Sequence, residues 1–202
     1  MKKVQFGKKQ QNGILWLLVF AAACIYLSLC FNNNIWTDEA FTIDLVKSNI
    51  AGIIAGTASD VHPPLYYLFV KGFLCVFGNH MLVMKLCSVL PTVGLMVLGA
   101  TWVNKRFGFK TALLFELLLL ALPRMLEYSV QLRMYALAML FILGCAVCAY
   151  EICLEPKWFH YALLSLLAAG AAYSHYFAFV SALWIYGFLF LALIFSITLI
   201  IS

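Results

Sequence analysis

The chain has 202 residues, of which 65% are hydrophobic and only 10% are charged, with a formal net charge of +5. Soluble globular domains are about 45–50% apolar, so this composition excludes an ordinary soluble domain and indicates an integral membrane protein. A helix needs about 20 apolar residues to cross a bilayer, which limits the chain to a handful of spans and excludes a sizeable soluble domain.

The first apolar segment covers residues 13–31 and follows a basic stretch. It is longer than the roughly 7–15 apolar residues of a signal peptide, so we expect an uncleaved membrane anchor. Two basic clusters flank apolar segments in this chain: Lys2, Lys3, Lys8 and Lys9, and then Lys105, Arg106 and Lys110. Such flanks are typical of cytoplasmic loops. We therefore expect a cytoplasmic amino terminus and no nucleic-acid partner.

Further apolar segments predict spans at 82–104, 111–130 and 134–154, and the uncharged stretch 158–200 divides into two helices near "YSHYF", residues 173–177. The expected fold is all-α: a polytopic transmembrane helical bundle of about six spans in one membrane domain, 1–202. Glu116, inside "LLFELLLL", is expected to be a neutral or hydrogen-bonded packing residue. "CAVC", residues 145–148, is interpreted as helix packing and not as a redox or zinc motif.

The segment 63–78 is ambiguous because it is short, opens with two prolines and carries Lys71 in its middle. It is either a seventh span or an interfacial helix. The interfacial alternative keeps "KRFGFK" on the cytoplasmic side and is favoured. The loop 32–81, the turn 123–135 and residues 173–177 then share the extracytoplasmic face, where the catalytic loop 32–81 is expected.

Within that loop, residues 37–56 predict one amphipathic juxtamembrane helix with Thr37 as its N-cap. Asp38 and Glu39 stand in its first turn, where acids also serve the helix dipole. Asp60 and His62 follow, and the two prolines after His62 restrict its backbone or simply begin a helix. Together these side chains offer a general base and oxygen ligands for a divalent cation such as Mg²⁺ or Mn²⁺, with Asp38 and Glu39 as the metal ligands.

Two more polar clusters share the predicted face. Arg133, followed by Met134 and Tyr135, is suited to binding a phosphate because a guanidinium group pairs with it bidentately. His175 lies between Tyr173 and Tyr176, which interfacial tyrosines alone also explain. A phosphate-bearing lipid is the kind of ligand these residues fit.

Four stretches, "WTDEAFT", "DVHPPLYYLFVKGFLCVFGNHMLVMKLCSVL", "LPRMLEYSVQLRMYALAML" and "YSHYFAFV", resemble the amino-terminal part of GT-C membrane glycosyltransferases. The nearest group is the protein O-mannosyltransferase-like family 39, with the related aminoarabinose transferases. The resemblance covers about residues 30 to 185. It implies a hexosyl- or mannosyltransferase-like enzyme that takes a sugar from a polyprenyl-phosphate carrier and transfers it to an acceptor at the extracytoplasmic face.

By this resemblance Asp38 is the catalytic or metal-associated carboxylate, with Glu39 beside it. His62, Arg133, Tyr135 and His175 are then donor-binding residues. Family members are often more than twice as long, so we expect this chain to be an amino-terminal portion. The competing expectation is a non-catalytic membrane subunit or inactive fragment that binds a lipid-linked sugar; a transporter, with polar groups near the bilayer midplane, fits less well.

Overall fold

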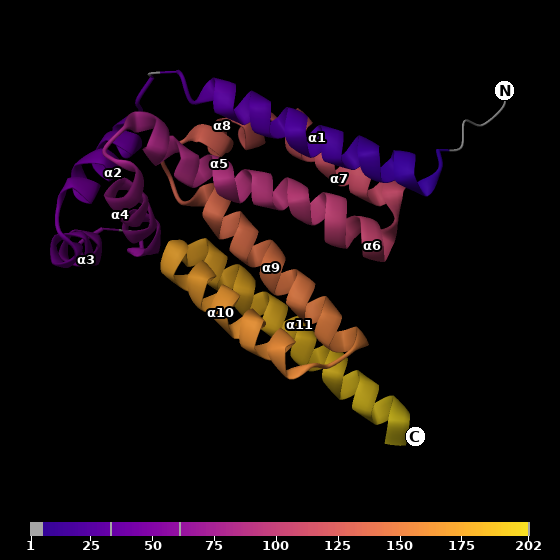
Figure 1. Cartoon of the computed structure of the whole chain (residues 1–202). Coiled ribbons are helices and arrows are strands. Elements are labelled where there is room, and N and C mark those ends of the chain that lie inside the picture. Colours follow the sequence, from indigo (N-terminus) through magenta and orange to yellow (C-terminus); the bar gives the residue numbers. More distant parts are fainter. Residues whose placement is uncertain (1–5, 33, 61, 202) are drawn as a thin grey trace. The chain divides into compact units, whose positions relative to one another are not determined.

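The computed structural model describes residues 6–201 apart from 33 and 61, and these residues form helices and short connections without a strand (Figure 1). Lys2 and Lys3 of the first basic cluster lie outside the described residues. Among these described residues, four helices are long and apolar enough to cross a membrane: Lys8–Leu29, Met81–Phe107, Tyr135–Leu154 and Tyr176–Ser196. The expected all-α membrane bundle is confirmed, and the chain is an integral membrane protein.

The helices group into two compact units, and each unit is built from two separate stretches of chain. The first unit comprises Met1–Glu39 and Phe73–Ala136, and the second comprises Ala40–Gly72 and Leu137–Ser202. Both units therefore take part of the loop 32–81 together with later helices.

In the first unit, α1 (Lys8–Leu29) packs against α5 (Met81–Leu98). A π-helical turn, η1 (Gly99–Val103), and the short α6 (Asn104–Phe107) continue α5 without a break. These helices confirm the spans predicted at 13–31 and 82–104. Pro91 lies inside α5, which a membrane helix tolerates because neighbouring helices re-satisfy the freed backbone groups.

The span predicted at 111–130 is wrong as a single helix. It consists of α7 (Phe109–Ala121) and α8 (Pro123–Val130), separated by Leu122 in an extended conformation with ψ 117°. Pro123 explains the break, because a proline pushes the preceding residue out of the helical region. The 13 residues of α7 reach only about 20 Å, short of the roughly 30 Å apolar thickness of a bilayer.

Glu116 of α7 is fully buried, as expected of a packing residue. Within the part of the chain that the structure describes, neither of its carboxyl oxygens has a hydrogen-bond partner, so of the two predicted alternatives the neutral packing residue is the one that stays. Its Cγ lies close to Gly99, where an added Cβ would be 3.1 Å from it. The absence of a side chain at Gly99 thus lets α7 pack directly on the π-helical turn.

The loop helix predicted over 37–56 is also wrong as one element. It is divided into α2 (Thr37–Lys47) and α3 (Ile50–Ala58). The side chain of Asn49 accepts the Gly52 N–H at 2.8 Å and starts α3. Lys71 donates its ammonium group to the Val46 carbonyl oxygen at 2.9 Å, near the end of α2. This contact gives the lysine within the apolar segment 63–78 a partner inside the second unit.

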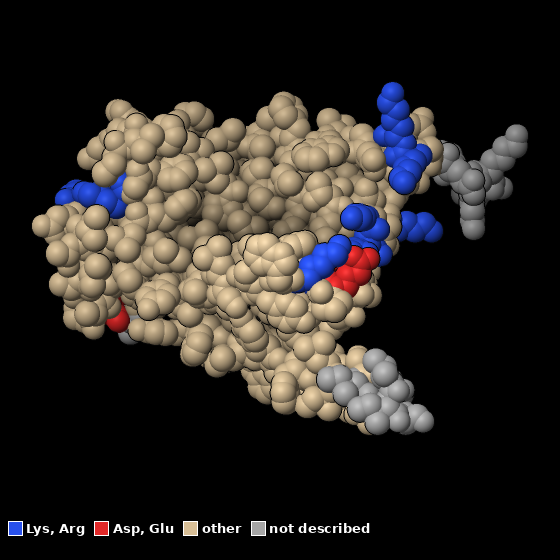
Figure 2. All heavy atoms as spheres, turned by 60° about the horizontal axis from the view of Figure 1, so that its bottom comes forward, with Lys and Arg blue, Asp and Glu red and all other residues tan. Residues whose placement is uncertain are grey.

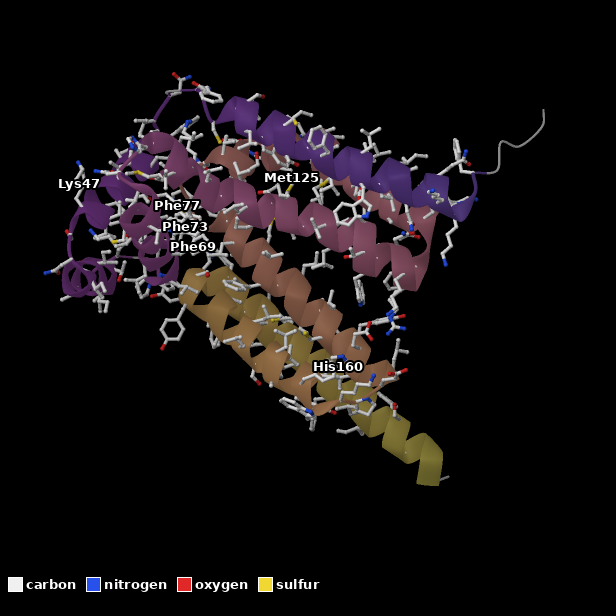
Figure 3. All side chains as sticks on the ribbon, in the orientation of Figure 1. Lys47, Phe69, Phe73, Phe77, Met125 and His160 are labelled. Carbon is white, nitrogen blue, oxygen red and sulfur yellow. The ribbon has the colours of Figure 1, made fainter. Side chains whose placement is uncertain are left out.

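The segment 63–78 contains α4 (Leu65–Phe77), whose 13 residues are too few for a span of about 30 Å. Phe69, Phe73 and Phe77 follow one another at four-residue spacing along one side of α4 (Figure 3). The length agrees with an interfacial helix, whose placement in the membrane stays a prediction.

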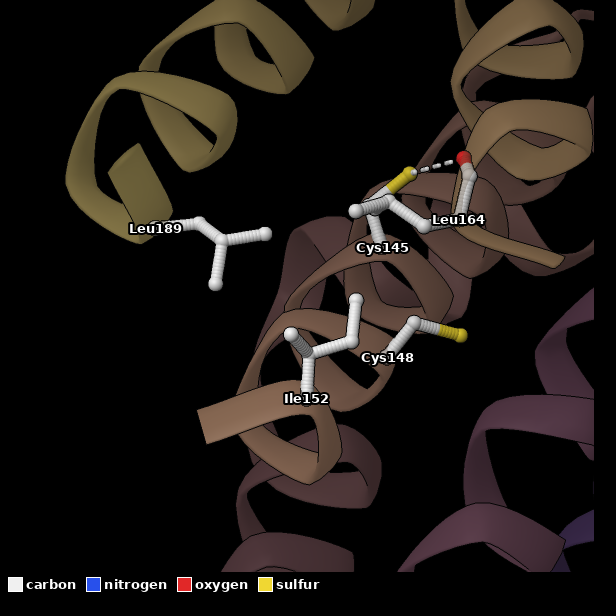
Figure 4. Packing of buried hydrophobic residues seen from close by; sticks show 5 residues of the cluster. All are labelled: Cys145, Cys148, Ile152, Leu164 and Leu189. Carbon is white, nitrogen blue, oxygen red and sulfur yellow. Dashed lines mark hydrogen bonds between the residues drawn. The ribbon is translucent and has the colours of Figure 1, made fainter. Parts of the chain in front are cut away.

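In the second unit, α9 (Tyr135–Leu154) confirms the span predicted at 134–154. The next two helices, α10 (Trp158–Ser174) and α11 (Tyr176–Ile201), are one residue apart. His175, with ψ 136°, separates α10 from α11, where the sequence predicts a division. Cys145 and Cys148 are free thiols buried against Ile152, Leu164 and Leu189 (Figure 4). They are packing residues, as expected.

Charged side chains are sparse on the face drawn in Figure 2, where most of the surface is formed by uncharged residues. The helix α11 exposes large apolar side chains: Phe177, Trp184, Phe188, Phe190 and Phe195. In water such a surface would aggregate, whereas lipid chains solvate it. The exposed residues therefore agree with a helix that faces lipid.

We expect Gly170→Ala to destabilise the second unit. The added Cβ would lie 2.8 Å from Cζ of the Phe141 ring, so α9 and α10 would have to separate slightly. Overpacking of this kind costs about 1–3 kcal/mol. The matched control is Gly187→Ala in α11, where no described atom lies within 4 Å. Thermal unfolding in detergent should show a lower midpoint for the first variant only; equal midpoints would contradict the packing.

Candidate functional site

The first unit brings Asp38, Glu39 and Arg133 together although about 95 residues separate them in the chain. A guanidinium N–H of Arg133 donates to the backbone carbonyl oxygen of Asp38 at 3.3 Å. The Arg133 Nη2 also lies 3.9 Å from the Asp38 carboxylate. The Arg133 side chain is 5% exposed and that of Asp38 is 64% exposed. An accessible carboxylate is therefore paired with a buried cation.

Glu39 is buried and turned back onto the backbone. One carboxylate oxygen accepts the Leu132 N–H at 2.8 Å, and the other accepts the Trp36 N–H at 3.0 Å. The second bond is the acidic half of a capping box, in which the third helical residue accepts from the backbone of the cap. Since α2 begins at Thr37 itself, the predicted N-cap at Thr37 is wrong, and the helix begins one residue earlier.

A second contact fixes the segment before α9. The buried hydroxyl of Ser88, on α5, donates to the Gln131 carbonyl oxygen at 2.5 Å and lies 3.5 Å from that of Arg133. Together with the bond from Leu132 to Glu39, this holds residues 131–133 between α2 and α5. The position of the arginine thus depends on two helices that are remote in sequence.

A pocket of about 390 Å³ lies beside this arrangement and has several polar walls. Its lining includes Glu39, Lys85, Gln131 and Asn34, together with Trp36. The Lys85 side chain is 3% exposed and donates to the backbone carbonyl oxygen of Asn32. Gln131 carries a buried amide oxygen that has no hydrogen-bond partner among the described residues. The pocket therefore combines a buried cation, the buried Glu39 carboxylate, a second carboxylate from Glu127 and neutral amides.

Sequence reasoning missed Lys85 and Gln131. The signal for Lys85 is in the sequence: a lysine in "MLVMKLCSVL", within an apolar span, is by default a functional-site candidate because burying its charge is costly. Gln131 has no comparable signal, because a glutamine at a turn is ordinary.

Tyr135 is not among the residues that line this pocket. Its ring packs against Tyr128, with ring centroids 4.7 Å apart. Arg124, at the start of α8, forms an exposed ion pair with Glu127 at 2.7 Å. Such an exposed pair contributes little to stability.

The two predicted histidines lie in the second unit and are brought together there. The rings of His62 and His175 are 5.5 Å apart at an angle of 65°. Nδ1 of His62 also lies 3.3 Å from the carboxylate of Asp60. Asp60, His62 and His175 therefore form a polar cluster within the second unit.

A divalent cation at Asp38 and Glu39 fits these residues poorly. Both oxygens of Glu39 already accept backbone N–H groups, and Asp38 faces the Arg133 guanidinium. No group of three or more metal-ligating His, Cys, Asp or Glu side chains occurs among the residues for which the structure gives positions. The predicted Mg²⁺ or Mn²⁺ remains a prediction.

The described geometry joins Asp38, Glu39 and Arg133 in one site and His62 with His175 in another. Compared with protein-family models, curated proteins and solved structures, the chain matches none of them.

Proposed function

We propose that this protein transfers a sugar from a polyprenyl-phosphate-linked donor to an acceptor hydroxyl at the extracytoplasmic face of the membrane. The observation that carries the proposal is the pocket of the first unit, where the buried Lys85 and Glu39 meet polar side chains beside the Asp38–Arg133 pair. A membrane protein that retains a buried lysine at a polar pocket has a use for its charge. An anionic lipid headgroup is the ligand that such a cation favours.

The donor has a charged phosphate and an apolar polyprenyl chain, and different parts of the first unit would bind them. Its phosphate would pair with Lys85 and Arg133, since charge-assisted hydrogen bonds to phosphate are strong in a site shielded from water. Its polyprenyl chain would remain among the apolar faces of the helices. The sugar would then extend from the phosphate toward the exposed Asp38 carboxylate.

The reaction follows from these roles. Asp38 accepts the proton of the acceptor hydroxyl while the hydroxyl oxygen forms a bond to the anomeric carbon. The bond between that carbon and the phosphate oxygen breaks, and the phosphate leaves with the electron pair. The two cations stabilise its negative charge as it develops. Attack from the side opposite the phosphate inverts the anomeric configuration, so a product with retained configuration would argue against this mechanism.

A second candidate function is binding of a lipid-linked sugar without turnover. The engagement of Glu39 favours it, because a carboxylate with both oxygens on backbone N–H groups acts as a structural element. The two candidates share the pocket and differ only in whether Asp38 removes a proton.

Donor binding tests the part that both candidates share. Lys85→Met keeps the length of the side chain and removes its charge. We expect it to weaken binding of a short-chain polyprenyl phosphate to the chain in lipid by about tenfold, the equivalent of one charge-assisted bond. Lys47→Met is the control, because Lys47 is exposed and pairs only locally with Asp44 at 2.7 Å. Equal affinities for both variants would remove Lys85 from the donor site.

A further inference from the structure

The pocket of the first unit carries a carboxylate that does not suit the phosphate of the proposed donor. Glu39 and Glu127 both line this pocket, beside the cation Lys85. Both oxygens of Glu39 accept backbone N–H groups, whereas the Glu127 side chain stands on α8 and is 36% exposed. A carboxylate and an ionised phosphate offer only acceptors, so they cannot hydrogen-bond to each other. Glu127 therefore suits a part of the ligand that donates hydrogen bonds.

Glu127 can accept from a ligand although it forms an ion pair. Nη1 of Arg124 donates to Oε2 of Glu127 at 2.7 Å. An ionised carboxylate has about four accepting sites on its two oxygens, and a single N–H occupies only one of them. The Arg124 side chain is 74% exposed, so it approaches the carboxylate from the solvent. Because Arg124 already balances the charge, neutral donors such as hydroxyls suit the remaining sites better than an ammonium group.

Trp36 adds a flat apolar surface to the same pocket. Its backbone N–H donates to the Glu39 carboxylate at 3.0 Å, and its carbonyl oxygen accepts the Glu39 N–H at 3.0 Å. These bonds fix the residue directly before α2, in whose first turn Asp38 stands. An indole combines a large apolar face with one N–H donor. A sugar ring has the matching form, because its C–H groups make an apolar face and its hydroxyls project from the edge.

We propose that Glu127 and Trp36 bind the sugar of the donor, whose hydroxyls donate to the carboxylate while the ring packs on the indole. Each hydroxyl also accepts, and the amides of Asn34 and Gln131 lie in the same lining. The phosphate lies at Lys85, as in the proposed function, on which this inference rests. The ligand class is thus a neutral sugar with free hydroxyls, joined to a lipid through a phosphodiester.

Two lipid phosphodiesters test the inference. Both probes carry a farnesyl chain and one negative charge; in one the phosphate is joined to the anomeric carbon of mannose, and in the other to a methyl group. Calorimetric titration of the chain in lipid nanodiscs, with empty nanodiscs as the blank, gives both dissociation constants. The mannosyl probe should bind about tenfold more tightly, the equivalent of one hydrogen bond to a charged group. Equal dissociation constants would overturn the assignment of the sugar to this pocket.

Glu127→Met removes the accepting oxygens and nearly keeps the length of the side chain. Because an ion pair this exposed contributes little to stability, the variant should fold. It should bind the mannosyl probe about tenfold more weakly and the methyl probe unchanged. Arg124→Met is the matched control, since it breaks the same ion pair and keeps the carboxylate, and it should leave both affinities unchanged. An equal loss of mannosyl affinity in the two variants would assign the effect to the ion pair and overturn the proposal.

Trp36→Ala tests the packing of the sugar on the indole. The side chain is 63% exposed and the bonds between Trp36 and Glu39 use only the backbone of Trp36, so the pocket should keep its shape. Affinity for the mannosyl probe should fall about threefold to tenfold, with no change for the methyl probe. A preference for the mannosyl probe that survives this substitution would contradict the packing.

The same probes separate this inference from the proposed function. Lys85→Met should weaken both probes to the same degree, because both carry the phosphate. A chain that binds neither probe would contradict the proposed function together with the sugar site. A chain that binds both probes equally, and both more weakly after Lys85→Met, would contradict only the sugar site. A folded chain that prefers the mannosyl probe and transfers no sugar would contradict only the transferase mechanism.

Discussion

Asp38→Asn is expected to lower sugar transfer by about two to four orders of magnitude, the usual contribution of a positioned general base. The amide is nearly the same size as the carboxylate and cannot take a proton from the acceptor hydroxyl. Because the Arg133 guanidinium donates to the backbone oxygen of Asp38, that contact survives the substitution. The measurement is the rate of transfer from a labelled polyprenyl-phosphate donor.

The control for this variant is Asp44→Asn, in the same helix. The Asp44 side chain is 76% exposed and pairs only with Lys47 three residues away, so its loss should leave the rate unchanged. Donor affinity should be similar in both variants, because Lys85 and Arg133 are intact. An Asp38→Asn chain that retains the full rate would show that another group accepts the proton.

Glu39→Ala is expected to destabilise the first unit by about 3 kcal/mol. The substitution leaves the N–H groups of Leu132 and Trp36 without their carboxylate acceptors. Hydrogen bonds to a charged group contribute about 1.5–3 kcal/mol each, and two bonds from one carboxylate do not add fully. Amide hydrogen exchange of Leu132 should accelerate more than that of residues within α1, which identifies the loss as local.

Glu155→Ala is the matched control, since that side chain is 64% exposed and pairs with the nearby Lys157 at 2.8 Å. It should change neither the unfolding midpoint nor the exchange of Leu132. Glu39→Gln should lie between the two, because an amide has one oxygen to accept and cannot serve both N–H groups. If Glu39→Ala unfolds no more easily than the control, the buried carboxylate is not what positions residues 131–133.

The long apolar helices were predictable because a bilayer imposes length and composition on a span. The division at His175 followed from the excessive length of residues 158–200. The errors occurred at local breaks inside apolar or amphipathic stretches. The break at Leu122 is visible in the sequence, because Pro123 follows it. The break after Lys47 depends on the cap at Asn49 and on the distant contact from Lys71.

The candidate site was predictable in its residue types and not in its contacts. Asp38 and Arg133 stood out as charges at the ends of apolar segments, yet nothing local in the sequence pairs residues so far apart. Glu39 was expected to share the chemistry, and its backbone contacts give it a structural role. Lys85 was not predicted as a site residue. A lysine within an apolar segment is by default a functional-site candidate, just as the acids of the loop are.

Sugar transfer by the unmodified chain in lipid vesicles tests the central claim most directly. One reaction supplies a labelled sugar on polyprenyl phosphate, and a parallel reaction supplies the same sugar as a nucleotide conjugate, with Asp38→Asn beside each. If the protein is such a transferase, turnover should occur with the lipid-linked donor alone and should be lost in the variant. Turnover with the nucleotide sugar, or no turnover by a folded chain that binds polyprenyl phosphate, would contradict it.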